Sequence, residues 1–295
     1  MEILTVENLS KNYGKIQALK GVSFAVPAGT VFGILGPNGS GKTTLLGIVM
    51  DVLKASGGGY KIFGAAPTNQ QRKQIGTLLE TPNFYHYLSA VQNLKIAAAI
   101  KGHGVEDIDR VLEIVNLSAR KNSRFSTYSL GMKQRLAIGA ALLGNPDVLV
   151  FDEPTNGLDP VGIAEIRELI KKLSQQGKTI IMASHLLDEV EKVCTHVAIL
   201  KQGTLITHGD VNEILVNEDM VEVSAPDISQ LENILKQLPG AGKIESVDKT
   251  VRIYFPSGTA NLAAVNQFCF NNGIVLSHLQ LKKKSLESKF FELTN

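Results

Sequence analysis

The sequence predicts a layered α/β fold with a mostly parallel sheet, an inserted helical subdomain and a small α+β domain after it. A strand-like run at 31–35 leads into a glycine-rich loop, and a helix-like run at 42–53 leads out of it. Apolar runs at 148–151 and 179–183 are typical of strands buried on both faces. These segments place a parallel sheet at the centre of the first part of the chain.

Further strands and the helical insertion follow from the spacing of apolar residues. Alternation predicts strands at 3–9 and 18–26, and short runs closed by Gly or Pro predict strands at 60–63 and 74–79. Apolar residues then recur at helical spacing, which predicts a helical subdomain at about 84–143.

Strands and helices alternate after this subdomain. The expected elements are a strand at 147–151, a helix at 161–173, a strand at 179–183, a helix at 186–193 and strands at 196–200 and 204–208. We therefore expect a first domain at 1–215.

A second domain is expected at 216–295, where the pattern changes. The expected elements are a strand at 221–224, a helix at 228–238, strands at 244–247 and 251–255, a helix at 261–270 and a strand at 274–281. This is the split β-α-β order of a small ferredoxin-like domain. A last helix is expected after Ser285, docked on this domain through Leu286, Phe290 and Leu293.

Composition excludes several classes of protein. The net charge of +2 does not favour a nucleic-acid surface, so no nucleic-acid partner is expected. The two cysteines, Cys194 and Cys269, lie far apart in apolar stretches and indicate buried thiols rather than a disulfide or a metal cluster. No signal peptide is suggested, and no apolar run approaches the ~20 residues of a membrane span. We expect a cytosolic protein whose membrane partner, if any, supplies the span.

The glycine-rich loop, Gly-Pro-Asn-Gly-Ser-Gly-Lys-Thr, predicts a phosphate site. Its glycines let successive N–H groups point at one anion, and the following helix adds its positive end. The alternative, a chance glycine-rich turn, is disfavoured by the flanking strand and helix. The expected binding residues are Gly36, Pro37, Asn38, Gly39, Ser40, Gly41, Lys42, Thr43 and Thr44. Lys42 is expected at the β- and γ-phosphates, and the Thr43 hydroxyl on Mg²⁺.

Two adjacent acids, Asp152 and Glu153, end the buried strand at 148–151. Unpaired acids do not belong in a core, but the carboxyl end of such a strand faces the ligand crevice. We expect Asp152 to hold Mg²⁺, and Glu153 to orient or deprotonate the water that attacks the γ-phosphate. A helix cap or a surface acid pair is the alternative.

Four further residues belong to the predicted site. His185 follows the strand at 179–183 and is placed to bond a γ-phosphate, although a lone histidine there is usually structural. Ser129 and Gly131 open a helix whose free N–H groups make a second anion site. Tyr13 precedes the phosphate loop, where its ring can stack on a base or simply pack. Two phosphate-binding surfaces on one chain suggest that one serves a partner's nucleotide.

With these motifs in this order, residues 2 to about 215 resemble the ATP-binding-cassette (ABC) ATPases. The resemblance implies a P-loop ATPase core and a head-to-tail homodimer with two ATP molecules at its interface. Each ATP would lie between the phosphate loop of one chain and Ser129 and Gly131 of the other. The resemblance also assigns Asp159, in the loop after Glu153, to the nucleotide interface, and Glu80 to the switch loop near Mg²⁺.

Two departures narrow the resemblance. The family's usual Leu-Ser-Gly-Gly-Gln signature is Tyr-Ser-Leu-Gly-Met here, at Tyr128 to Met132, and its usual switch-loop Gln is Glu80. Both features, and the small C-terminal domain, look like the subfamily that confers bacitracin and lantibiotic resistance. That likeness implies an ATPase on the cytoplasmic face of the membrane, which powers export of a peptide antibiotic through a separate permease.

Two alternatives remain open at this point. A soluble cassette ATPase that acts on DNA or ribosomes is disfavoured, because the chain has neither a heptad run nor a second phosphate loop. A nucleotide-regulated switch with little turnover is disfavoured by Glu153. The transported substrate, its direction and the role of the C-terminal domain are not encoded in these motifs, so an ABC transporter ATPase for an unrelated substrate is a further alternative.

Overall fold

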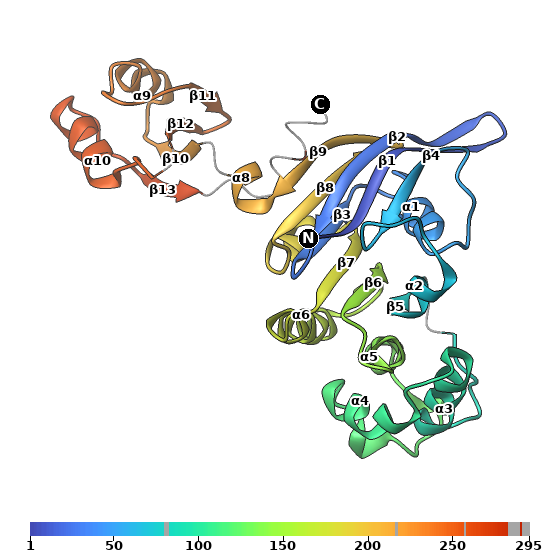
Figure 1. The fold of residues 1–295 in the computed structure, drawn as a ribbon. Coiled ribbons are helices and arrows are strands. Elements are labelled where there is room, and N and C mark those ends of the chain that lie inside the picture. Colours follow the sequence, from blue (N-terminus) through green and yellow to red (C-terminus); the bar gives the residue numbers. More distant parts are fainter. Residues whose placement is uncertain (80–82, 216–217, 257, 283–289, 291–295) are drawn as a thin grey trace. The chain divides into compact units, whose positions relative to one another are not determined.

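The computed structural model describes residues 1–79, 83–215, 218–256, 258–282 and 290, and the chain divides into two compact units. The first unit is Met1–Val211 and the second begins at Asn212. In Figure 1 the first unit runs from blue through yellow and the second is orange to red. Each unit has its own hydrophobic core and is described by itself.

A six-stranded sheet forms the centre of the first unit, in the order β5-β6-β7-β3-β8-β9. The strands are β3 (Val31–Leu35), β5 (Ile75–Leu78), β6 (Val148–Asp152), β7 (Thr179–Ser184), β8 (His196–Lys201) and β9 (Thr204–Asp210). The first five are parallel and β9 is antiparallel to β8. Every residue of β3, β6 and β7 is buried, as the continuous apolar runs predicted. The predicted α/β class is confirmed.

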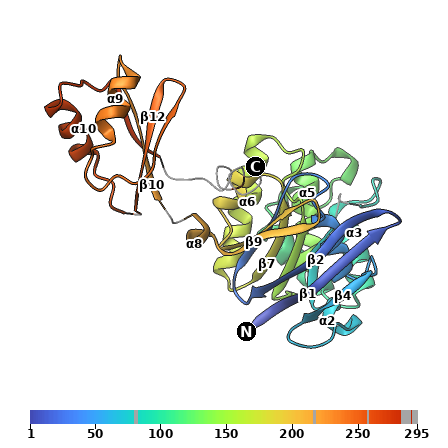
Figure 2. The same ribbon diagram turned by 90° about the horizontal axis from the view of Figure 1, so that it is seen from above.

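A second, antiparallel sheet packs on the first through a shared core. Its order is β2-β1-β4, with β1 at Glu2–Tyr13, β2 at Ile16–Pro27 and β4 at Gly57–Ile62. The rings of Phe24 and Phe32 stack across the two sheets with their centroids 5.4 Å apart. Figure 2 shows the three strands side by side. The strand predicted at 3–9 extends to Tyr13, because Tyr13 still pairs with Ile16.

Helices flank the central sheet and form the insertion. They are α1 (Lys42–Val49), α2 (Asn69–Lys73), α3 (Ala90–Lys101), α4 (Ile108–Ile114), α5 (Leu130–Leu142), α6 (Pro160–Gln175) and α7 (Leu187–Glu191). The predicted helical subdomain consists of α3, α4 and α5 (Figure 1). A capping box between Ser89 and Gln92 starts α3. Phe125 is 1% exposed, and its ring packs edge-on against those of Phe84 and His86.

The second unit has the predicted ferredoxin-like order. After α8 (Val211–Leu215) come β10 (Glu218–Ser224), α9 (Ile228–Leu235), β11 (Ile244–Val247), β12 (Thr250–Pro256), α10 (Leu262–Asn271) and β13 (His278–Lys282). The sheet order is β11-β12-β10-β13, all antiparallel. The last strand begins at His278 rather than Ile274, because the Ile274 N–H still bonds to Cys269 at the end of α10. The helix predicted after Ser285 lies outside the described residues.

The described residues include no helix long and apolar enough to cross a bilayer. Cys194 and Cys269 are both buried free thiols, as predicted.

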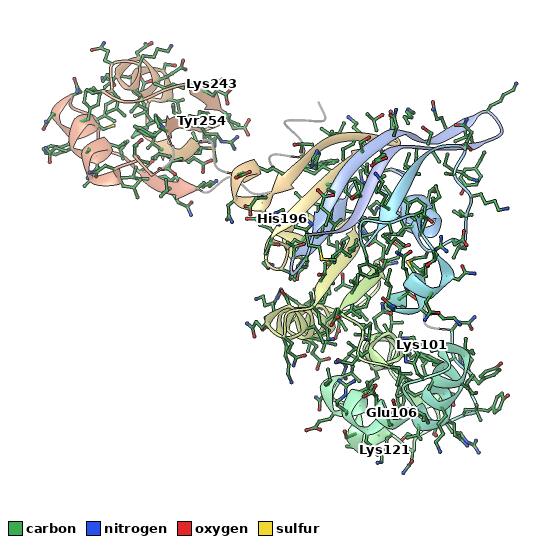
Figure 3. The ribbon with its side chains drawn as sticks, viewed as in Figure 1. Lys101, Glu106, Lys121, His196, Lys243 and Tyr254 are labelled. Atoms are coloured by element: carbon green, nitrogen blue, oxygen red, sulfur yellow. The ribbon has the colours of Figure 1, made fainter. Side chains whose placement is uncertain are left out.

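The second unit carries polar side chains on its sheet. The Tyr254 hydroxyl donates a hydrogen bond to Glu245, which also forms an ion pair with Lys243 (Figure 3).

Candidate functional site

The phosphate loop connects β3 to α1 at the carboxyl edge of the parallel sheet. Two of its glycines are required by backbone geometry. Gly36 has φ 152°, and a Cβ there would lie 2.2 Å from the Leu200 carbonyl oxygen. Gly41 has φ 105°, and a Cβ there would lie 2.7 Å from the Ala18 carbonyl oxygen. Only glycine fits both positions, so the loop can hold this curled form.

A hollow of about 290 Å³ lies over this loop. Its lining residues are Ala18, Asn38, Gly39, Ser40, Gly41, Lys42, Thr43, Thr44 and Glu153. Gly41 occupies the N-cap of α1 and offers no side chain to the first N–H groups of the helix. These N–H groups and the positive helix end make the hollow suited to a phosphate.

Lys42 is buried in the loop, with only 5% of its surface exposed. Its ammonium donates to the Gly36 carbonyl at 2.8 Å and to the Pro37 carbonyl at 3.3 Å. The same Nζ lies 3.3 Å from Glu153 Oε1. A buried charge needs such partners, and an anion in the hollow would compete with them for the Lys42 ammonium.

Glu153 directly follows β6, and its backbone is strained. Its φ is +48°, in the left-handed region that non-glycine residues rarely adopt. The Glu153 N–H donates to the Ala183 carbonyl of β7 at 3.0 Å, which holds this conformation. Asp152, the last residue of β6, is 3% exposed. Glu153 therefore lies against the phosphate loop, and Asp152 is buried just before it at the end of β6.

His185 follows β7 and contacts Glu153 directly. Its Nδ1 lies 2.8 Å from Glu153 Oε2, and its side chain is 33% exposed. The Glu153 carboxylate thus bridges the ammonium of Lys42 and the imidazole of His185. The order β6-β7-β3 explains this meeting, because the carboxyl ends of all three parallel strands share one edge.

Other predicted residues lie outside the lining of this hollow. Ser129 is exposed and caps α5 by accepting a bond from the Met132 N–H at 3.3 Å, and Gly131 is half-buried in the first turn. Asp159 caps α6 by accepting a bond from the Gly162 N–H at 2.9 Å. Glu80 lies outside the described residues.

Tyr13 ends β1 and is 45% exposed. The Lys11 ammonium lies 5.0 Å from the centre of its ring, in a cation–π contact. Tyr13 does not line the hollow, whereas Ala18 does, and sequence reasoning missed Ala18. An alanine side chain has no group that marks it as a binding residue, and Ala18 lines the hollow only because β2 passes beside the phosphate loop.

The donor set fits a magnesium ion held mainly by nucleotide phosphates. The described residues contain no group of three or more His, Cys, Asp or Glu side chains placed to hold a metal by themselves. Mg²⁺ is usually bound through one or two protein oxygens together with substrate phosphates. The Thr43 hydroxyl in the hollow and the Asp152 carboxylate at the same sheet edge offer oxygens of that kind.

A larger hollow of about 820 Å³ lies at the opposite, amino-terminal edge of the strands. None of the predicted site residues lines it. Lys101 in its wall (Figure 3) donates to the Ala141 and Leu143 carbonyls at 3.0 and 3.1 Å. Burial lowers the pKa of Lys101 to about 8. The lysine closes the C-terminal end of α5, so its role here is structural.

The fold and the site define a P-loop nucleoside triphosphatase. The loop between β3 and α1, the acid pair after β6 and the histidine after β7 occupy one edge of a parallel sheet. Comparison with known proteins narrows this class to one family.

The ABC transporter family matches residues 19–156. An uncharacterized ABC transporter ATP-binding protein of Bacillus subtilis, YhcH, is 37% identical and spans 99% of this chain and 96% of its own. The bacitracin transport ATP-binding protein BcrA of Enterococcus faecalis is 34% identical over 99% of this chain and 96% of its own. The lantibiotic transport ATP-binding protein SrtF of Streptococcus pyogenes is 37% identical over 69% of this chain and 89% of its own.

Solved structures agree with these relatives. The ADP conformation of MJ1267, an ATP-binding cassette of an ABC transporter, has a TM-score of 0.66 and 31% identity, covering 72% of this chain and 92% of that chain. The dimeric ATP-binding cassette MJ0796, bound to ADP and Pi, has a TM-score of 0.63 and 26% identity, covering 70% of this chain and 98% of that chain. This chain belongs to the ABC transporter ATP-binding proteins. It binds ATP and is the ATPase subunit of a transporter.

Proposed function

We propose that this subunit powers export of a peptide antibiotic of the bacitracin or lantibiotic type through a separate membrane permease. The observation that carries the proposal is the 34% identity to a bacitracin transport ATP-binding protein over 99% of the chain. That likeness extends through the second unit, beyond the part shared with the lantibiotic relative. The substrate class therefore rests on both units rather than on the ATPase core alone.

The proposed active form is a homodimer with two ATP molecules at its interface. Ser129 is exposed and Gly131 is half-buried at the start of α5, and both lie outside the hollow formed by their own chain's phosphate loop. A second copy would bring them over that hollow, with Asp159 beside them. A solved relative that is dimeric supports this arrangement.

The proposed site gives a role to each of its residues. Lys42 leaves the loop carbonyls and Glu153 for the γ-phosphate, while loop N–H groups hold the phosphates. Glu153, once released, orients and deprotonates the attacking water, and His185 holds Glu153 and the γ-phosphate in place. Thr43 and Asp152 would hold Mg²⁺, with Glu80 nearby; the ion neutralises charge on the phosphates when bound.

We further propose that the subunit sits on the cytoplasmic face of the membrane through its permease. The test is a pair of experiments in a host carrying the adjacent genes. We expect the subunit to co-purify with a membrane protein in detergent, and loss of the pair to sensitise cells to bacitracin or a lantibiotic. Failure to associate with any membrane protein, or tight binding to DNA or ribosomes instead, would overturn the proposal.

A further inference from the structure

An ion pair joins the two helices that follow the acid pair and the histidine. Arg167 of α6 donates from Nη1 to Glu189 Oε2 of α7 at 2.7 Å. The two side chains are 23% and 18% exposed, so the pair is largely withdrawn from solvent. Burial alone raises the pKa of Glu189, but hydrogen bonds from Lys192 and Arg167 outweigh it and hold this pKa below its ordinary value. Glu189 is therefore ionised, and its contact with Arg167 is charge-assisted.

Helix α7 needs such an anchor, because it has little to stabilise it alone. It spans Leu187–Glu191, and Leu186 at its N-cap has no side chain that can cap it. So short a helix is not stable by itself in water. Val190 provides one anchor: it is fully buried, and a Cβ on Gly33 of β3 would lie 2.8 Å from its Cγ1. Glu189 provides the other anchor, from the adjacent position.

These contacts close a ring through the proposed catalytic pair. Glu153 leads through the following loop into α6 and Arg167, and Arg167 binds Glu189 of α7. Just before α7, His185 contacts Glu153 again, with Nδ1 at 2.8 Å from Oε2. We propose that Arg167 is a positioning residue for hydrolysis, which acts through Glu189 to hold His185 against Glu153. The proposal rests on the roles proposed above for Glu153 and His185.

Lys192 supplies a matched control within the same cluster. Its ammonium also bonds to Glu189, at 2.9 Å from Oε1, but it lies in the same segment at i+3 and is 52% exposed. Lys192 therefore helps to neutralise Glu189 without joining α7 to α6. If neutralising Glu189 were all that mattered, losing either cation would have a similar effect. If the bridge positions His185, only the loss of Arg167 matters.

The experiment compares Arg167→Met with Lys192→Met in the full-length protein. We expect Arg167→Met to lower kcat roughly tenfold, below the ~100-fold that a 1 Å misplacement can cost. The dissociation constant for ATP should stay unchanged, because the phosphate loop connects β3 to α1 and neither element carries Arg167 or Glu189. Lys192→Met should keep kcat within about twofold, and Arg167→Lys should restore part of the loss. The double variant Arg167→Met, Glu189→Gln should be no slower than Arg167→Met alone, since both changes break one bridge.

Nuclear magnetic resonance of labelled histidine measures the chemical shift of the His185 ring, which a change in folding stability alone does not alter. We expect the His185 ring signal to shift in Arg167→Met and to keep its wild-type position in Lys192→Met. Glu189→Gln serves the same test if Arg167→Met does not fold. The proposal is overturned if Arg167→Met keeps wild-type kcat, or if both methionine variants lose activity equally. Glu153→Gln and His185→Ala are assayed in parallel: if they still hydrolyse ATP, the proposed catalytic roles fail, whichever way Arg167 behaves.

Discussion

Replacing Glu153 with glutamine tests the centre of the proposed site. The two side chains have the same shape, so a glutamine can keep a contact with His185, now 2.8 Å from the carboxylate. The amide cannot accept a proton from water. Loss of a positioned general base typically costs 10²–10⁴-fold, so we expect kcat to fall about a hundredfold or more. That loss equals roughly 3–5 kcal/mol in the activation barrier.

Glu153→Gln should lower kcat without weakening ATP binding. The carboxylate lies 3.3 Å from the Lys42 ammonium and competes with an incoming phosphate for it. At an effective dielectric constant of about 20, two charges at that distance attract by roughly 5 kcal/mol, much of which desolvation offsets. Removing the negative charge therefore leaves ATP affinity equal to the wild type or higher, and ATP should trap the variant as a dimer.

The assay has three measurements on one preparation: phosphate release at saturating ATP, equilibrium binding of a fluorescent ATP analogue, and size-exclusion chromatography with ATP. Glu113→Gln, at an exposed position on α4, is the matched control and should behave as the wild type. Near-normal hydrolysis by Glu153→Gln would refute the assigned role. Weakened ATP binding would refute the competition between Glu153 and phosphate for Lys42.

Three further predictions concern the phosphate loop, the switch loop and the helical subdomain. Gly41→Ala should weaken ATP binding at least about tenfold, because its Cβ would meet the Ala18 carbonyl oxygen at 2.7 Å and the strained φ costs ~1–3 kcal/mol. Gly39 also has a positive φ, but a Cβ there would meet no neighbour. Gly39→Ala should therefore lose less ATP affinity in the same titration. Glu80→Gln should leave ATP binding intact and change the ratio of transport to hydrolysis; an unchanged ratio in reconstituted vesicles would make the position neutral. Phe125→Ala should lower the free energy of unfolding by about 3–5 kcal/mol in a denaturant titration, because the ring is 1% exposed and packs against the rings of Phe84 and His86.

The helical subdomain and the signature helix show how far local patterns reach. Ser89 and Gln92 form a capping box that can be recognised in the sequence, because the two residues bond to each other's backbone. Ser129 likewise caps α5 through the Met132 N–H. What Ser129 does beyond capping depends on a second chain, so neither the sequence nor the structure of one chain completes its site.

The second unit marks another limit. The order of its strands and helices follows from local periodicity, and it is the predicted one. The burial of Glu222, in contrast, had no signal in the sequence. Its side chain is 9% exposed, and Lys282, Arg252 and His278 surround the carboxylate from neighbouring strands. Hydrogen bonds from Lys282, above all, hold the pKa of Glu222 below its ordinary value.

By itself, the sequence determined the phosphate loop and the acid pair. The loop is one continuous stretch whose form depends on glycine dihedrals, such as φ 105° at Gly41, and on the helix that begins after it. The acid pair is readable because two carboxylates end a fully apolar strand. Both signals are local, so they survive without knowledge of the fold.

Only the tertiary structure decided which of these residues meet. The Glu153 carboxylate bridges Lys42 and His185 because β7 lies between β6 and β3, and that order is set by packing of the whole sheet. The same is true of Ala18 beside the phosphate loop and of the bond between Arg167 and Glu189. Contacts between distant segments depend on how every layer packs, and no short stretch of the chain encodes that arrangement.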